Sequence, residues 1–253
     1  IMASKKLQEN INLLRKIKLQ GVNEIIGNSP KNRLKSNITE DEANLSQNDK
    51  YSNELNNISS FPDLKAINNL DDLKDYMSKF KGCELHKSAT NMVFSDGNKS
   101  SQIMLIGEAP GHDEDVQGKP FVGRSGKLLN KMLEAIGLSR ETVYIANIVP
   151  WRPPNNRRPT EEEINICLPF IRKHIELIAP KVLMLLGSTA TYALLRNKEG
   201  ITKIRGKWVD MEFGKLKVPT LPSFHPAFLL RQPAQKKYSW EDLKMLKKKI
   251  DES

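Results

Sequence analysis

The chain has 253 residues, of which 38% are hydrophobic, enough for one α/β domain with a packed core and an N-terminal extension. Its formal net charge of +10 favours a polyanionic partner, nucleic acid before an anionic membrane. Apolar runs are far shorter than the ~18 residues of a membrane helix, and no signal-peptide pattern occurs. Two cysteines far apart in sequence suggest reduced thiols, so we expect a cytoplasmic protein that does not associate with membranes.

The first 62 residues differ from the rest of the chain. Leucine and isoleucine recur near a 3.6-residue period among lysines, which predicts a helical extension over residues 1–35. Residues 36–62 are rich in Asn, Ser and acidic side chains and predict a flexible linker. Residues 63–253 then form the predicted main domain.

Strands and helices alternate through this main domain. Apolar, β-branched runs predict strands buried on both faces at residues 103–106, 143–149, 182–186 and 218–224. Helices are predicted before Gly137, from a capping box at Thr160 with a break or kink at Pro169, from Ser188, and from a cap at Ser239. The alternation predicts a three-layer α/β/α sandwich with a central four-stranded parallel sheet.

Polar residues stand at the carboxyl ends of these strands, where open parallel sheets bind ligands. Glu108 follows the first strand in a glycine-rich loop, which is either an ordinary strand-to-helix turn or a ligand loop. Asn147 interrupts the second strand, and its amide either ties down a neighbouring loop or faces a ligand, to which it offers a donor and an acceptor side by side. His225 follows the fourth strand and is either a core histidine or a site residue.

Five ordered blocks resemble the family-four uracil-DNA glycosylases. They are GEAPG (107–111), GKPFVGR (118–124), YIAN (144–147), RPPNNR (152–157) and SFHPAFLLR (223–231), within a resemblance that spans about residues 83–250. The resemblance implies the α/β/α fold and, as substrate, uracil in single- or double-stranded DNA. It is consistent with a monomeric, nucleoid-associated repair enzyme of bacterial type.

The resemblance also implies roles for individual residues. Glu108 would hold the attacking water and stabilise positive charge on the sugar, and His225 would donate a hydrogen bond to uracil O2. The implied substrate-binding residues are Gly107, Ala109, Glu114, Phe121 and Asn147. Among these, Phe121 would stack on the base, Asn147 would read its edge and Glu114 would crowd the C5 position. The implied DNA-binding residues are Arg124, Arg152, Arg157, Arg231 and Leu229, the last as a wedge in the base stack.

Family-four enzymes bind a [4Fe–4S] cluster through four cysteines, and the matching positions here are Phe80, Cys83, Trp151 and Cys167. Two thiolates cannot hold a cluster that takes four, so we expect no metal and no cofactor. Our hypothesis is that Phe80 and Trp151 replace coordination by packing. A zinc site of the two cysteines completed by His86 is an alternative.

Two other functions compete with the enzyme. A uracil-DNA-binding or covalently trapping relative would not turn over. However, the known trapping offshoot inserts a histidine-bearing loop after the second strand, and residues 149–160 contain no histidine. A replication accessory factor would act through residues 1–62 and would not need Glu108, Asn147 or His225.

Overall fold

A computed structural model of the protein describes residues 62–252. The predicted helical extension and, apart from Pro62, the predicted linker lie outside the described residues. None of the helices in residues 62–252 is long and apolar enough to cross a membrane.

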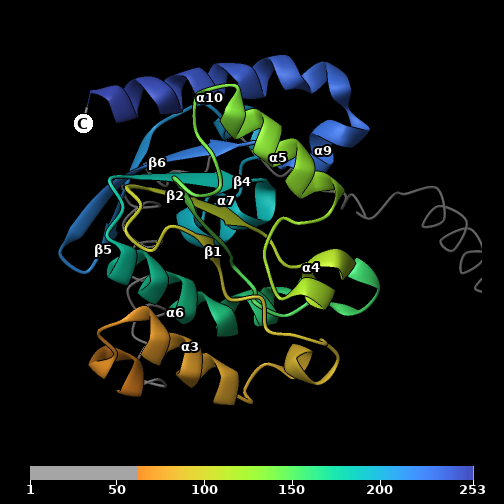
Figure 1. Cartoon of the computed structure of the whole chain (residues 1–253), viewed down its shortest axis with the longest axis vertical. Coiled ribbons are helices and arrows are strands. Elements are labelled where there is room, and N and C mark those ends of the chain that lie inside the picture. The colour runs from red at the N-terminus through yellow and green to blue at the C-terminus, as the bar shows by residue number, and fades with distance from the viewer. Residues whose placement is uncertain (1–61, 253) are drawn as a thin grey trace, which may run out of the picture. The chain divides into compact units, whose positions relative to one another are not determined.

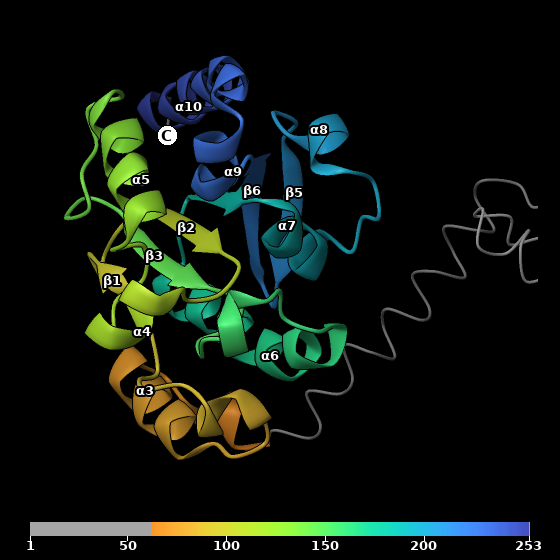
Figure 2. The same ribbon diagram turned by 90° about the vertical axis from the view of Figure 1, so that its right-hand side faces the viewer.

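A six-stranded sheet forms the centre of the domain (Figures 1 and 2). Its strands are β1 (Asp96–Gly97), β2 (Ile103–Gly107), β3 (Tyr144–Asn147), β4 (Val182–Leu186), β5 (Val209–Phe213) and β6 (Leu216–Ser223). The strand order is β1-β3-β2-β4-β6-β5. The four inner strands are parallel, whereas β1 and β5 pair antiparallel at the edges. The predicted four-stranded parallel sheet is therefore the centre of a larger mixed sheet.

Helices cover both faces of this sheet. The α-helices are α3 (Leu70–Lys79), α4 (His112–Gln117), α5 (Arg124–Glu134), α6 (Glu161–Ile178), α7 (Ser188–Leu195), α8 (Ile201–Ile204), α9 (Pro226–Arg231) and α10 (Lys236–Asp251). Short 3-10 helices occupy Pro62–Ala66, Glu84–Lys87, Pro154–Asn156 and Pro233–Gln235. Figure 1 shows α5 and α10 on one side of the sheet and α3 and α6 on the other, which confirms the three-layer architecture.

The two faces of β2 illustrate why the sequence folds this way. Met104 and Ile106 pack in one hydrophobic cluster with side chains of α3, α6 and α7, whereas Ile103 and Leu105 pack in a second cluster with α5 and α10. Alternate side chains of a strand point to opposite faces, so a continuous apolar run supplies both cores at once. The buried sheet then fixes the positions of the loops that follow each strand.

One predicted helix start is wrong, and of the break or kink predicted at Pro169 the break does not occur. The helix α6 runs without a break from its capping box at Thr160 to Ile178, although Pro169 lies inside it. Burial of Cys167, Phe170 and Ile171 on either side of the proline keeps this segment packed. The helix α10 begins at Lys236, not at Ser239, because Ser239 faces the core and is 2% exposed.

Candidate active site

The loops at the carboxyl ends of β2, β3 and β6 meet around one cavity of about 220 Å³. Its lining includes the three predicted catalytic residues Glu108, Asn147 and His225, and also Phe121 from the loop before α5. The chain connects β2 to β3 on one side and then returns past β2 to β4, and such a reversal opens a crevice beyond the strand ends. The topology therefore brings together residues that lie up to 117 positions apart.

Asn147 lines this cavity and carries a buried acceptor without a partner in the described chain. The side chain is 7% exposed, and within the described residues its Oδ1 has no hydrogen-bond partner. Leaving a buried carbonyl unpaired costs about 1–3 kcal/mol. The alternative in which Asn147 ties down a neighbouring loop through this oxygen therefore finds no support among the described residues.

Phe121 forms an aromatic wall beside the amide. Its ring is buried and stacks on the imidazole of His225, with ring centroids 5.4 Å apart and an interplanar angle of 29°. Gly107 leaves space for the side chains of Phe121 and Asn147, because a Cβ there would lie 2.5 Å from Phe121 Cζ and 2.5 Å from Asn147 Oδ1. A flat ring can therefore meet both an aromatic face and an amide edge.

The imidazole of His225 is held as a neutral hydrogen-bond donor. Its Nδ1 accepts a hydrogen bond of 3.1 Å from the backbone N–H of Ala227 at the start of α9, which leaves the proton on Nε2. Burial, assisted by the positive charge of Arg231, lowers the pKa of His225 from 6.5 to about 4. At neutral pH the ring can therefore stabilise developing negative charge without carrying a charge itself.

The carboxylate of Glu108 is oriented by a residue that the sequence did not point to. Thr189, in the first turn of α7, donates a hydrogen bond from its hydroxyl to Oε2 of Glu108. The two residues are 81 positions apart, and a threonine at the start of a helix carries no signal of such a role. Their contact follows from the parallel pairing of β2 with β4, which places Glu108 beside the beginning of α7.

Glu114 lines the same cavity, but its carboxylate accepts hydrogen bonds from backbone N–H groups. Its two carboxylate oxygens accept hydrogen bonds from the N–H groups of Gly111, Val122 and Gly123 at 2.9–3.1 Å. Ala109 also lines the cavity. The structure thus places every predicted substrate-binding residue in or against this site and gives Glu114 a loop-holding role that the sequence did not predict.

The four predicted DNA-binding arginines differ in exposure and in the side chains that bind them. Arg124 and Arg231 are exposed and line a neighbouring hollow of about 400 Å³, which shares Ser125 and Asn156 with the cavity. Arg157 lines the cavity itself, and both its terminal nitrogens bind Glu163. Arg152 is held by Asn156 and His112. Arg124 and Arg231 are therefore the better placed to receive a phosphate.

The expected wedge, Leu229, is not at the surface. Its side chain is 1% exposed and belongs to the core cluster under α5 and α10. The next residue, Leu230, is 37% exposed and lines the hollow beside Arg231. The prediction for Leu229 is corrected accordingly, because a buried core leucine cannot enter a base stack.

The four positions that the resemblance assigns to cluster ligands lie in one apolar region. The rings of Phe80 and Trp151 stack with centroids 6.4 Å apart, and Phe80 meets Phe170 edge to face at 4.9 Å. Cys83 and Cys167 are free and buried. A hydrogen bond with Cys83, together with burial, raises the pKa of the Cys167 thiol. A phenyl and an indole cannot ligate iron, so these residues do not fit a [4Fe–4S] cluster.

The zinc alternative also lacks a ligand set in the part of the chain that the structure describes. No group of three or more His, Cys, Asp and Glu side chains there is arranged to hold a metal ion. The Nδ1 atom of His86 lies 2.7 Å from the carbonyl oxygen of Cys83, so one ring nitrogen is engaged with the backbone.

Comparison with known proteins identifies the family of the chain. The family model of the uracil DNA glycosylase superfamily matches residues 94–247. A type-4 uracil-DNA glycosylase of Saccharolobus solfataricus is 42% identical over 73% of this chain and 88% of its own length. Enzymes of the same description from Thermotoga maritima (45% identical; 63% of this chain, 82% of the relative) and Archaeoglobus fulgidus (39%; 71% and 92%) are similar too. The chain belongs to the uracil DNA glycosylase superfamily.

Proposed function

We propose that this protein is a DNA repair enzyme that hydrolyses the N-glycosidic bond between uracil and deoxyribose in DNA. The observation that carries the proposal is the convergence of Glu108, Asn147, His225 and Phe121 on one cavity. The names of the similar type-4 uracil-DNA glycosylases support the same activity.

Base recognition relies on Asn147 and Phe121. The unpaired Oδ1 of Asn147 accepts from uracil N3–H, and its NH₂ group donates to O4. Cytosine presents the opposite donor and acceptor on that edge, so it leaves both groups of the amide unpaired. Phe121 covers one face of the base.

Bond cleavage relies on His225 and Glu108. As the C1′–N1 bond breaks, its electron pair moves onto the base and the sugar gains positive charge. The Nε2–H of neutral His225 stabilises the uracil anion at O2, and the carboxylate of Glu108 stabilises the sugar. A water molecule adds to C1′, its proton passes to Glu108, and the uracil anion takes up a proton on release.

The base must leave the duplex before it can enter the cavity, at a cost of a few kcal/mol. Arg124 and Arg231 bind the phosphates on either side of the flipped nucleotide, and Leu230 fills the space that the base leaves. We further propose that the protein acts as a monomer at the nucleoid and accepts uracil in single or double strands, the single strand at the lower cost.

We also propose that this chain works without an iron–sulfur cluster. The stacked pair Phe80 and Trp151, braced by Phe170, supplies apolar packing where the resemblance places two cluster ligands. The chemistry above needs no metal, because a carboxylate and an imidazole stabilise the two charges that develop.

One assay tests the function. The purified protein is incubated with an oligonucleotide that contains one uracil, treated with alkali and run on a denaturing gel, and a thymine oligonucleotide is the control. We expect catalytic strand scission at uracil, lost in Glu108→Gln, Asn147→Ala and His225→Ala. A heat-stable adduct in place of scission would establish trapping. The absence of both products would favour the replication accessory factor.

A further inference from the structure

Residues 120–123, here called the Phe121 loop, hold Phe121 in an unfavourable backbone conformation. Its φ of +54° lies in the left-handed region, where a bulky side chain is rarely found. Such a conformation persists only when the surroundings over-determine it. The α5 helix contributes by close packing, because a Cβ on Gly126 would lie 1.8 Å from the carbonyl oxygen of Phe121.

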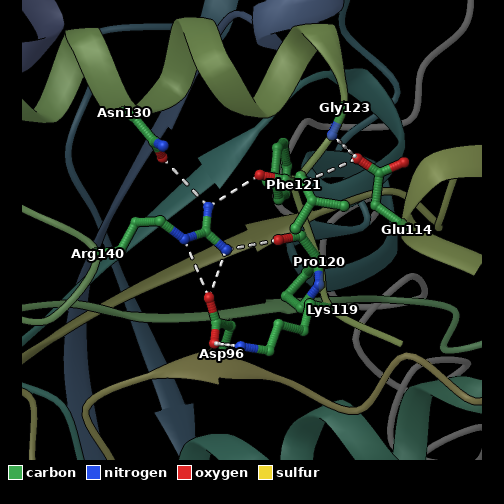
Figure 3. Close-up of polar contacts among 9 residues, drawn as sticks. Asp96, Glu114, Lys119, Pro120, Phe121, Gly123, Asn130 and Arg140 are labelled. Atoms are coloured by element: carbon green, nitrogen blue, oxygen red, sulfur yellow. Dashed lines mark hydrogen bonds and ion pairs between the residues drawn. The ribbon is translucent and has the colours of Figure 1, made fainter. Parts of the chain in front are cut away.

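Arg140 holds the loop by its carbonyl groups (Figure 3). The guanidinium donates to the carbonyl oxygens of Pro120 at 2.7 Å and Phe121 at 2.9 Å. It is fixed in turn by Asp96, at 2.6 and 3.0 Å, and by Asn130 at 3.2 Å. These five hydrogen bonds use the planar fork of arginine, which a lysine cannot reproduce. Arg140 does not line the cavity itself.

Glu114 holds the same loop by its N–H groups. One carboxylate oxygen accepts from Val122 at 3.0 Å and from Gly123 at 2.9 Å. Figure 3 shows the guanidinium of Arg140 at the carbonyl groups of Pro120 and Phe121 and the carboxylate of Glu114 at the N–H group of Gly123. Polar groups of four successive residues are thus bound by two side chains of opposite charge.

We propose that Arg140 is a positioning residue for the reaction, which together with Glu114 fixes the Phe121 loop before the base arrives. The aromatic wall is then preformed, and binding of uracil does not have to order it. This inference rests on the proposed function for its catalytic consequence but not for its structural one.

The structural part is tested by hydrogen exchange. In Arg140→Lys, we expect the amides of the Phe121 loop to exchange at least about tenfold faster, while the strands keep their protection. Arg172→Lys is the matched control, since Arg172 also donates to a backbone carbonyl, that of Glu212 at 3.1 Å, and lies over the ring of Phe213. Unchanged exchange in Arg140→Lys would overturn the proposal.

The catalytic part is tested by single-turnover kinetics on a uracil oligonucleotide. We expect Arg140→Lys to slow excision about tenfold, with affinity for uracil-free DNA unchanged, because only the aromatic wall is displaced. Added guanidinium should restore part of the rate of Arg140→Ala but none of that of Phe121→Ala. A loosened loop with a wild-type rate would refute the positioning role. If the wild type excises no uracil, the proposed function fails, whereas the exchange result still decides whether the loop is held.

Discussion

The carboxamide oxygen of Asn147 is buried without a hydrogen-bond partner in the described chain, so the folded protein carries its desolvation cost until a ligand arrives. Removing the amide should therefore cost activity but not stability. We expect Asn147→Ala to lower kcat/KM for uracil excision at least about 100-fold, since a lost base-reading contact discriminates strongly. Its Tm should be unchanged or higher in thermal denaturation. A marked fall in Tm would mean that the amide has a structural partner.

The lowered pKa of His225 predicts an unusual pH dependence. The unfolded chain takes up a proton on this ring below pH 6.5, whereas the folded chain does so only near pH 4. Stability from the neutral ring is therefore complete above pH 6.5 and falls as pH drops towards 4. Excision should show no inflection near pH 6.5 that depends on His225.

A pH–rate profile of the wild type and His225→Gln measures this. The glutamine variant keeps a donor and should retain more activity than His225→Ala, which we expect to lose about 100-fold or more. A rate that falls as pH rises through 6.5, with no such fall in the glutamine variant, would show that the charged ring is the active form.

At the scale of elements, the last residue of β2 must be glycine, because Gly107 lies against two side chains of the cavity. We expect Gly107→Ala to abolish excision, because its methyl group would collide with Asn147 and Phe121. Gly137→Ala is the control. It also adds a methyl group, at a left-handed φ of +73°, but nothing lies within 4 Å, so it should cost only backbone strain of about 1 kcal/mol and leave excision intact. Equal losses in both variants would argue against crowding of the cavity.

The short helix α9 separates a core leucine from an exposed one. Leu229→Ala should lower the free energy of unfolding by about 2–5 kcal/mol, as expected for a buried leucine. Leu230→Ala should change it by no more than about 0.5 kcal/mol. The same variant should slow excision from a duplex more than from a single strand. Equal effects on both substrates would exclude a wedge role for Leu230.

At the scale of the whole molecule, the sequence predicts what depends on local pattern. The apolar runs predict the four inner strands. Because these strands are parallel, Glu108, Asn147 and His225 lie together at their carboxyl ends. The edge strand β1 has only two residues and β5 is largely exposed, so neither carries a clear apolar signal. Thr189 and Arg140 act through tertiary contacts with loops that are distant in sequence, and no local pattern marks such partners.

Because Phe80 packs against Trp151 where the resemblance places cluster ligands, we expect the purified protein to lack iron. Purified protein should show no absorbance shoulder near 400 nm and no stoichiometric iron. Prolonged dialysis against a chelator should leave its Tm and excision rate unchanged, since on this proposal folding does not depend on a metal. Loss of stability after chelation would contradict this account.

If the chain works without a cluster, as proposed above, the Phe80–Trp151 stack needs no metal supplied by the cell. A coordinated cluster depends on bound metal and on thiolates that oxidants attack, whereas a phenyl–indole stack forms as the chain folds. On the account proposed above, a cell that is short of iron or exposed to peroxide would keep this route for clearing deaminated cytosine from its genome.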